Sequence, residues 1–412
     1  MNSYEERLKK RIELLEKNHK ETIFQDSSKE ISERVKSSFS EPDIEITPVL
    51  EETSNKEDNK LYIASLNPPN INNDVYKFGK KKKEKIFEEK NDEDIKSLKR
   101  SSDLVNKIKG EIKKFVVGQD KVIDGLIRGL ICNGHVLLEG VPGIAKTLTI
   151  RALGQVTGCS VKRVQFTVDL LPTDIIGITS YTPGKGFEVI KGPIFANFLI
   201  ADEINRSPPK TQSALLEAMQ EKQVTIGKTS FELPTPFFVM ATKNPLQNTG
   251  VYQLPEAQVD RFLFNLIMSY PNLDEEKRIM EDNATLKKFE EFKLTAVITP
   301  KDILDMQELV KKIHMGDHIK SYIIAIVEKT RDKNFKLSDC IAYGSSPRAS
   351  IALFIASKAR ALMEGRNYVL PEDVREVCED VLRHRIILSY KATIKGVTSE
   401  AIIKEILEEV RA

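Results

Sequence analysis

One stretch of the sequence decides the fold: His135-Val136-Leu137-Leu138-Glu139-Gly140-Val141-Pro142-Gly143-Ile144-Ala145-Lys146-Thr147. It begins as a short apolar run, which is the pattern of a buried parallel strand. It then passes two glycines and a proline and enters a helical pattern that runs from Leu148 to Val156. A turn of this kind points backbone N–H groups inward, and the following helix adds the positive end of its dipole. The stretch therefore predicts a loop that binds phosphate.

The end of this stretch carries the two side chains that such a loop needs. Lys146 would reach the β- and γ-phosphates of a nucleotide, and the Thr147 hydroxyl would coordinate Mg²⁺. Ala145 stands where the strict pattern has its last glycine, and the relaxed pattern also occurs by chance in unrelated chains. An ordinary strand-to-helix turn with a surface lysine is therefore an alternative, which the residues downstream have to decide.

Composition bounds the kind of protein. A chain of 412 residues with 40% hydrophobic content predicts two or three domains with a proper core. The formal net charge of +2 gives no reason to expect nucleic acid as a partner. The four cysteines are far apart and form no CxxC pair, so neither a zinc site nor a disulfide framework is indicated. Without a long apolar stretch or a signal-peptide pattern, we expect a soluble cytoplasmic protein with no membrane span.

The first hundred residues differ from the rest of the chain. They are rich in Lys, Glu, Ser and Asn, and such a segment buries too little apolar surface to offset its conformational entropy. We predict a mostly disordered extension over residues 1–97, with a possible helix from Glu5 to Lys20. The run Lys80–Lys83 could indicate nucleic acid or an anionic membrane, but nearby glutamates such as Glu84 favour a solvated charge cluster.

From residue 98 the pattern becomes that of a folded α/β domain. Amphipathic segments over Leu104–Phe115 and up to about Leu130 come first, and apolar strands then alternate with helices such as Thr147–Val156 and Pro208–Gln220. The predicted strands are His135–Glu139, Val161–Phe166, Phe198–Ala201, Phe237–Thr242 and Phe262–Met268. This alternation predicts a parallel sheet with helices on both faces.

Two hairpins interrupt the alternation, and a helical domain follows it. The hairpins are predicted at Thr179–Val189 and Val224–Leu233, each with a glycine-containing turn. From Asp274 onward the pattern is wholly helical, with Thr299 and Ser346 as N-caps before Pro300 and Pro347. The predicted helices are Glu275–Leu286, Pro300–Lys312, His318–Thr330, Pro347–Met363 and Pro371–Leu382. The expected domains are thus 98–272 for the α/β core and 273–412 for the helical part.

Two adjacent acids end a strongly apolar strand, Phe198-Leu199-Ile200-Ala201-Asp202-Glu203. Acids at the edge of a buried strand are costly unless they have a function. In a nucleotide site Asp202 would hold the Mg²⁺ shell, and Glu203 would polarise the water that attacks the γ-phosphate. The alternative is a strand that simply exits into an acidic loop.

Three further polar residues lie where such a site could use them. Asn244 follows the next apolar strand and could orient the same water, although Asn-Pro is also a plain turn signal. Arg261 precedes the last strand and could stabilise charge on a neighbouring subunit's phosphate, or be a surface charge. Arg348 projects from the first turn of a capped helix and could reach a phosphate, or be solvated.

Taken together, these elements resemble the AAA+ ATPases, and within them closely the MoxR family. The resemblance covers about residues 98–412. It rests on ordered runs that include Gly-Val-Pro-Gly-Ile-Ala-Lys-Thr (140–147), Gln165-Phe166-Thr167, Ala201-Asp202-Glu203-Ile204-Asn205-Arg206, Leu254 to Phe262 and Ser346-Pro347-Arg348-Ala349. Alanine at position 145 is common in MoxR-like loops.

The resemblance implies a P-loop NTPase core with strand order 5-1-4-3-2, an all-α lid, ATP and Mg²⁺ as cofactors, and a role for each motif. Lys146 and Thr147 match Walker A, Asp202 and Glu203 match Walker B, and Asn244 matches sensor 1. Arg261 matches the arginine finger that acts in trans, and Arg348 matches sensor 2. The residues implied to bind the nucleotide are Gly118, Gln119, Gly140, Val141, Pro142, Gly143, Ile144, Ala145, Lys146, Thr147 and Leu148, with Thr147 and Asp202 at the metal.

The family's members form ring hexamers and act as ATP-driven chaperones or assembly factors, often with proteins that carry a von Willebrand factor A (VWA) domain. The resemblance therefore implies a homo-oligomer with a VWA-domain protein or another protein client. Lys243 departs from the family pattern, since glutamine is usual before the sensor asparagine. Three other interpretations stay open: a DNA-dependent motor of the same superfamily, a nucleotide-gated scaffold with little turnover, and a subunit of a magnesium-chelatase-type complex.

Overall fold

The computed structural model describes residues 95–411, apart from 142, 145, 185, 245–251 and 284–293. The predicted disordered extension, the Glu5–Lys20 helix and the Lys80–Lys83 run therefore lie outside the described residues, except for residues 95–97. A helix over residues 95–112 opens the described part. It begins before the Leu104 predicted from the sequence, because Leu98 already packs into the core.

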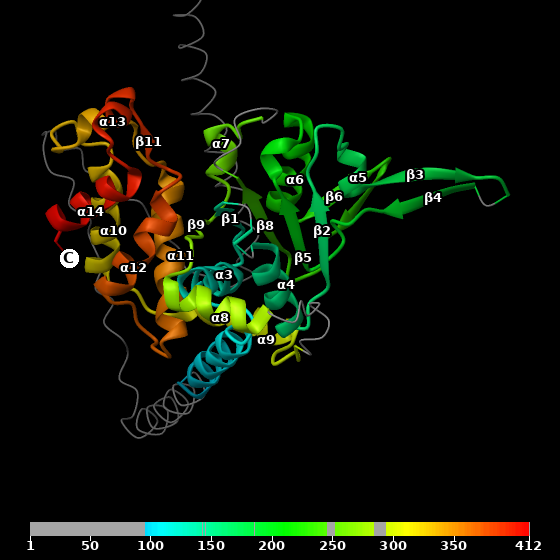
Figure 1. The fold of residues 1–412 in the computed structure, drawn as a ribbon, viewed down its shortest axis with the longest axis horizontal. Coiled ribbons are helices and arrows are strands. Elements are labelled where there is room, and N and C mark those ends of the chain that lie inside the picture. Colours follow the sequence, from blue (N-terminus) through cyan, green and yellow to red (C-terminus); the bar gives the residue numbers. More distant parts are fainter. Residues whose placement is uncertain are drawn as a thin grey trace, which may run out of the picture. The chain divides into compact units, whose positions relative to one another are not determined.

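Five parallel strands form the central sheet (Figure 1). They are β1 (Val136–Glu139), β2 (Val161–Gln165), β5 (Phe198–Asp202), β8 (Phe238–Lys243) and β9 (Phe264–Ile267). Their order across the sheet is β2-β5-β8-β1-β9, and every neighbouring pair is parallel. Counted in chain order this is 5-1-4-3-2, so the predicted topology is confirmed.

Alternate residues of these strands feed two hydrophobic clusters, one on each face of the sheet. Val136 and Leu138 belong to one cluster, while Leu137 between them belongs to the other. The first face is covered by α3 (Asp120–Ile131) and α4 (Lys146–Val156), and the second by α6 (Pro209–Glu221). Helices thus lie on both faces, as the alternation of strands and helices predicted.

Both predicted hairpins are present. A short helix, α5 (Pro172–Ile176), leads into β3 (Gly177–Thr182) and β4 (Gly186–Lys191), which pair antiparallel and extend away from the sheet (Figure 1). This hairpin is longer than the predicted Thr179–Val189, because pairing continues to Gly177 opposite Lys191. The second hairpin consists of β6 (Gln223–Ile226) and β7 (Thr229–Glu232).

The C-terminal part of the chain is helical, with one correction. Its helices are α8 (Leu273–Asn283), α9 (Pro300–Lys312), α10 (Asp317–Lys329), α11 (Pro347–Met363), α12 (Pro371–Leu382), α13 (Tyr390–Lys395) and α14 (Ser399–Glu409). Thr299 and Ser346 cap α9 and α11 with their side chains, as predicted. The prediction of an exclusively helical region is wrong, because β10 (Ile341–Tyr343) pairs with β11 (Ile387–Leu388). Strands this short have no readable period, and their pairing joins segments far apart in the chain.

Core and helical part share one hydrophobic cluster, which runs from α3 and α4 to α14. The predicted boundary between residues 272 and 273 stays a prediction. Over the residues described, no helix combines the length and the apolar composition that crossing a membrane requires. The predicted cytoplasmic location is likewise still a prediction.

His135 is a buried residue directly before β1, and its ring bonds to β8 and to α6. Its Nδ1 accepts a hydrogen bond from the Val239 backbone N–H at 3.0 Å, so its Nε2 carries the proton and donates to the Met219 carbonyl at 3.1 Å. Burial lowers the pKa of His135 from 6.5 to about 4, partly opposed by the bond to Met219. A protonated ring would place a second donor against the Val239 N–H.

We predict that His135 makes the fold sensitive to mild acid. Below pH 6.5 the unfolded chain binds a proton that the folded chain refuses until about pH 4, so stability is lost as the pH falls through this window. Between pH 7 and pH 5 the wild type should lose about 2 kcal/mol more unfolding free energy than a His135→Gln variant. Chemical denaturation at both pH values measures this, and parallel pH profiles for the two chains would contradict it.

Candidate active site

The loop between β1 and α4 forms an open cradle at the carboxyl end of the sheet. Gly143 has a φ of +87°, and nothing lies within 4 Å of the position that a Cβ would take there. Lys146 folds back over the loop, and its Nζ donates to the Gly140 carbonyl at 2.6 Å. Burial lowers the pKa of Lys146, while the charges of Asp202 and Glu203 oppose this. Of the loop's predicted residues, Pro142 and Ala145 lie outside the described residues.

Thr147 and Asp202 meet at the place predicted for the metal. The Thr147 Oγ1 donates to the Asp202 Oδ2 at 3.3 Å, which joins the start of α4 to the end of β5. Burial alone would raise the pKa of Asp202, but hydrogen bonds from Thr242, Arg163 and Thr147 and the charge of Arg163 outweigh it and lower that pKa. Asp202 is therefore held as a carboxylate.

This donor set fits Mg²⁺. The metal prefers oxygen ligands and takes only one or two from the protein, leaving its other positions to water and phosphate. One carboxylate beside one hydroxyl at the mouth of a phosphate cradle meets that requirement. Within the described ranges no group of three or more His, Cys, Asp or Glu could hold a metal, so this pair is not in competition with such a cluster.

Glu203 faces the same site because the backbone turns sharply after β5. Its φ of 55° and ψ of 51° are left-handed, which costs a non-glycine residue on the order of 1 kcal/mol. The Thr242 side chain supports this turn, since its hydroxyl accepts from the Glu203 N–H at 2.8 Å and donates to the Asp202 Oδ1 at 2.6 Å. Thr242 is fully buried, so the acid pair is fixed from behind by β8.

Two residues of the edge strand β2 hold the two acids from the side. The Arg163 Nη2 donates to the Asp202 Oδ2 at 2.6 Å, and the Gln165 amide donates to the Glu203 Oε2 at 3.1 Å. Residues two apart on a strand share a face, so both acids lie over the same side of the sheet. Arg206 also pairs with Glu203, at 3.1 Å. Glu203 is thus already engaged by two donors.

Asn244 lies between the loop and the acids, as the strand order implied by the family resemblance predicts. β8 is flanked by β1 on one side and β5 on the other, and Asn244 is buried directly after it. Lys243, the departure from the family pattern, pairs with Glu139 at 3.4 Å, and the Asn265 amide donates to the same carboxylate at 3.2 Å. Lys243 therefore braces the strand that leads into the loop.

Gly118 and Gln119, which the resemblance implies bind the nucleotide, lie next to the loop. The Gln119 amide donates to the Ser269 carbonyl at 3.0 Å, and a Cβ on Gly118 would come within 2.5 Å of the Glu275 carboxylate. A Cβ on Gly140 would in turn meet Met268 at 3.1 Å. Gly118 and Gln119 thus reach the phosphate loop through the segment that follows β9.

Arg261 and Arg348 lie at the opposite end of the sheet, where the parallel strands begin. Leu263 donates to the His135 carbonyl at 2.7 Å, which places Arg261 beyond the start of β1, whereas the loop follows its end. His135 and Glu139 alone are about 13 Å apart at 3.3 Å per residue. The Arg348 Nη1 pairs with the Asp260 Oδ2 at 3.3 Å, so Arg348 also lies at the end of the sheet where the strands begin. The structure does not bring either arginine to the loop of its own chain.

Four residues that contact the acids or the arginines were not predicted from the sequence: Arg163, Thr242, Gln165 and Asp260. Thr242 offered a weak signal, since it is a polar residue at the end of an otherwise apolar strand. Arg163 and Gln165 offered only their alternation on one strand. The partners of Asp260 lie 86 to 125 positions away, so no local pattern could have found them.

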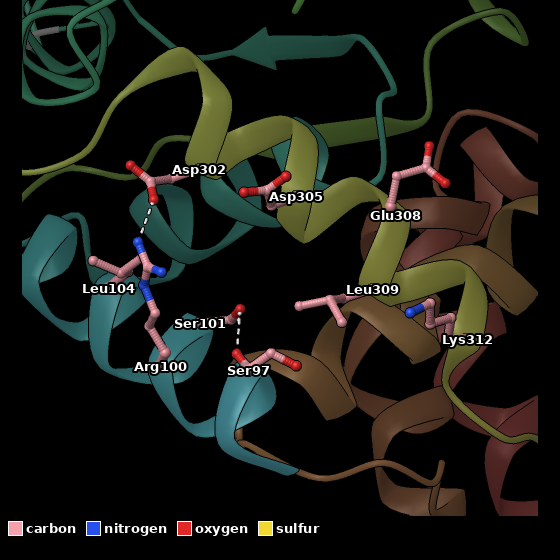
Figure 2. Close-up of a pocket in the computed structure, with 9 residues that line it drawn as sticks. All are labelled: Ser97, Arg100, Ser101, Leu104, Asp302, Asp305, Glu308, Leu309 and Lys312. Atoms are coloured by element: carbon pink, nitrogen blue, oxygen red, sulfur yellow. Dashed lines mark hydrogen bonds and ion pairs between the residues drawn. The ribbon is translucent and has the colours of Figure 1, made fainter. Parts of the chain in front are cut away.

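A groove of about 460 Å³ lies elsewhere, between the helix of residues 95–112 and α9 (Figure 2). It is lined by three acids of α9, and two of them, Asp302 and Glu308, have partners within the chain. Asp302 caps α9 through Thr299 and pairs with Arg100 at 2.9 Å, and Glu308 pairs with Lys311 at 2.6 Å. None of its lining residues belongs to the phosphate loop or the acid pair.

Comparison with known proteins shows which family the chain resembles. Residues 135–264 match the model of the ATPase family associated with various cellular activities (AAA), and residues 336–406 match the AAA lid domain. The chain is 44% identical over 305 residues to Chaperone MoxR1 of Mycobacterium tuberculosis, covering 73% of this chain and 80% of that protein. It is 43% identical over 309 residues to YeaC of Bacillus subtilis, covering 75% and 94%.

A solved structure has the same fold. A crystal structure of a protein from Cytophaga hutchinsonii superposes with a TM-score of 0.73 at 42% sequence identity, covering 79% of this chain and 98% of that one. The chain belongs to the MoxR family of AAA+ ATPases. This membership decides against a subunit of the magnesium-chelatase type.

We predict that the Thr242 hydroxyl is a large contributor to the stability of the site. A Thr242→Val variant keeps the shape of the side chain but leaves the Asp202 carboxylate and the Glu203 N–H without this partner. The free energy of unfolding should fall by about 2 kcal/mol. Thr225→Val, at an exposed position of β6, is the matched control and should change it by less than about 0.5 kcal/mol. Equal effects in a denaturant titration would contradict the prediction.

Proposed function

We propose that this protein binds ATP with Mg²⁺ and hydrolyses it in an oligomeric ring, most simply a hexamer. The observation that carries the proposal is the convergence of Lys146 and Thr147, at the start of α4, with Asp202 at the end of β5. A surface lysine on an ordinary turn would not fold over a loop beside a buried and a half-buried acid. The charges of Asp202 and Glu203 oppose the effect of burial on the pKa of Lys146, which is consistent with this arrangement.

Each residue has one task in this proposal. Lys146 and the N–H groups of the loop bind the phosphates, and Thr147 and Asp202 hold the metal. Mg²⁺, when bound, supplies positive charge that neutralises the developing charge on the phosphate oxygens. Glu203 orients and polarises the attacking water, and Asn244 orients it from the neighbouring strand. To do so, Glu203 has to exchange its bonds to Gln165 or Arg206 for the water.

The two arginines motivate the ring. Arg261 and Arg348 lie at the end of the sheet that is remote from their own loop, so these two arginines can reach a phosphate only in a second subunit. An arginine offered in trans stabilises charge in the transition state and is worth about 10³–10⁵ in rate. Arg348 lies beside Asp260 and Arg261. We therefore propose that Arg348, like Arg261, contacts the nucleotide of the neighbouring subunit.

The work done is the remodelling, assembly or maturation of a protein complex. The family supports a chaperone-like AAA+ ATPase. By the same family reasoning, the partner is a VWA-domain protein or another protein client. Hydrolysis without added DNA tests this against a DNA-dependent motor, whose turnover would need DNA.

We predict that a Glu203→Gln variant binds ATP but scarcely hydrolyses it. The amide keeps the size of the side chain but cannot accept the proton of the water, so kcat should fall about 100-fold or more. The Kd for Mg·ATP should stay within about twofold, because Glu203 does not hold the nucleotide. Phosphate release and nucleotide binding are measured on the same preparation.

Glu221→Gln, at the exposed end of α6, is the control and should behave as wild type. Unchanged hydrolysis by Glu203→Gln would remove Glu203 from its role. A wild type that binds ATP and releases no phosphate would favour a nucleotide-gated scaffold.

We predict that Arg261→Ala abolishes hydrolysis and that mixing restores it. Lys146→Ala subunits cannot use their own site but offer an intact Arg261, and Arg261→Ala subunits have the reverse defect. A mixture should regain phosphate release that neither variant has alone, as expected for an arginine acting in trans. Arg100→Ala, at an exposed position, controls for loss of an arginine. Normal ATP hydrolysis by Arg261→Ala alone would refute the proposal that Arg261 acts in trans.

A further inference from the structure

Asp260 joins the core to the helical part directly before Arg261. Its Oδ2 accepts hydrogen bonds from the Ser346 hydroxyl at 3.1 Å and from the Arg348 Nη1 at 3.3 Å. Its Oδ1 accepts one from the Arg385 Nε at 2.8 Å. One carboxylate of the core is thus bonded to three side chains from two segments of the helical part.

The bond to Arg385 is the fixed half of this junction. The Arg385 side chain is 3% exposed, and beyond Asp260 it donates to the carbonyls of Val381, Phe262 and Leu263. A guanidinium with every edge engaged cannot turn without leaving buried groups unpaired. Arg385 therefore ties the backbone on both sides of Arg261 to the end of α12.

The bond to Arg348 is the exchangeable half. The Arg348 side chain is 52% exposed, and its side chain makes one bond to Asp260, at 3.3 Å. An exposed ion pair of this kind is weak in water, so another anion can replace the carboxylate. Ser346, which caps α11, stays on the same oxygen and keeps the first turn of the helix in place.

Arg261 follows Asp260 directly in the chain and lies next to this junction. Its Nε is buried and has no hydrogen-bond partner within the described part of the chain. The backbone fixes its position instead, through bonds from Arg261 to the Gln258 carbonyl and from Phe262 to the Val259 carbonyl. Three arginines crowd this corner, and Asp260 supplies the opposite charge that lets them lie together.

We propose that Asp260 is a positioning residue that presents Arg261 and Arg348 together to the nucleotide of the neighbouring subunit. Arg385 holds Asp260 still, Asp260 holds the start of α11, and Arg348 exchanges the carboxylate for a phosphate oxygen when the neighbouring site is filled. The proposal rests on the proposed function, because it needs a trans site to act on. It adds that the two arginines are set as a pair by one acid.

The test begins with Asp260→Asn in the full chain. Asparagine keeps the size of the side chain but removes the charge, and its amide group faces like donors on Arg348 or Arg385. We expect kcat for ATP hydrolysis to fall about tenfold or more with KM within about twofold, because the chain's own nucleotide site is untouched. Asp260→Glu restores the charge and should recover part of kcat. An unchanged kcat in Asp260→Asn overturns the proposal.

A double-mutant cycle with Arg348→Ala shows whether the acid acts through that arginine. If it does, the combined variant should lose no more than about twofold beyond the stronger single variant, since both remove one interaction. Losses that multiply would mean independent roles and would overturn the proposal. If Asp260→Asn does not fold, Ser346→Ala replaces it in the cycle, and it should lower kcat with KM unchanged.

Asp380 offers a matched control for a merely structural junction. It lies on α12 and pairs with Arg128 of α3 at 3.5 Å and with Arg383 at 3.6 Å, so it also connects core and helical part, but not at Arg261. Asp380→Asn should lower the melting temperature and leave kcat within about twofold. If Asp260→Asn has the same signature, its role is structural and the proposal fails.

Subunit mixing separates this proposal from the proposed function. Asp260→Asn subunits mixed with Lys146→Ala subunits should regain hydrolysis, because the Lys146→Ala subunit supplies an intact arginine pair to the Asp260→Asn site. Failure to regain it overturns the placement in trans. If Arg261→Ala hydrolyses ATP normally, the proposed function fails. If Asp260→Asn hydrolyses ATP normally while Arg261→Ala does not, only the inference about Asp260 fails.

Discussion

The site depends on the Asp202 carboxylate. Its two oxygens receive the hydroxyls of Thr147 and Thr242 and the guanidinium of Arg163, so one acid joins α4, β8 and β2 at the end of β5. A buried carboxylate is tolerated only when such donors replace its water. The same arrangement aligns the loop with the acid pair, because Thr147 follows Lys146 directly. The geometry of the phosphate site therefore follows from satisfying one buried charge.

Much of this could be predicted because it is local. A strand, a glycine turn and a helix are contiguous in 135–156, and predominantly apolar runs mark β5, β8 and β9. The order 5-1-4-3-2 came from the resemblance and not from periodicity, since no single strand encodes its neighbours. The convergence of Lys146, Thr147 and Asp202 then follows, because the carboxyl ends of parallel strands share one edge.

The remainder could not be predicted because it depends on contacts between distant segments. The β10–β11 pair joins residues 341–343 to 387–388, and neither is long enough to show a period. Arg163 holds Asp202 from 39 positions away, and Arg385 holds Asp260 from 125. A charged residue on a strand or after a helix is usually solvated, so its sequence neighbourhood does not reveal a buried partner.

The separation of loop and arginines has a consequence for how nucleotide state is transmitted. Within one subunit, the paired strands β1 and β9 run from the end of the sheet that carries the arginines to the end that carries the phosphate loop. Their register is fixed, with Val136 opposite Phe264 and Glu139 opposite Ile267. A change at the phosphate loop cannot slide these strands without breaking their ladder, so it moves the subunit as a body or acts through the segments beyond the strands. Those segments are 268–275, which touches Gly118, and 260–263, which Arg385 binds. The helical part meets both ends of β9, and it is therefore the element best placed to pass the state of one site to the next.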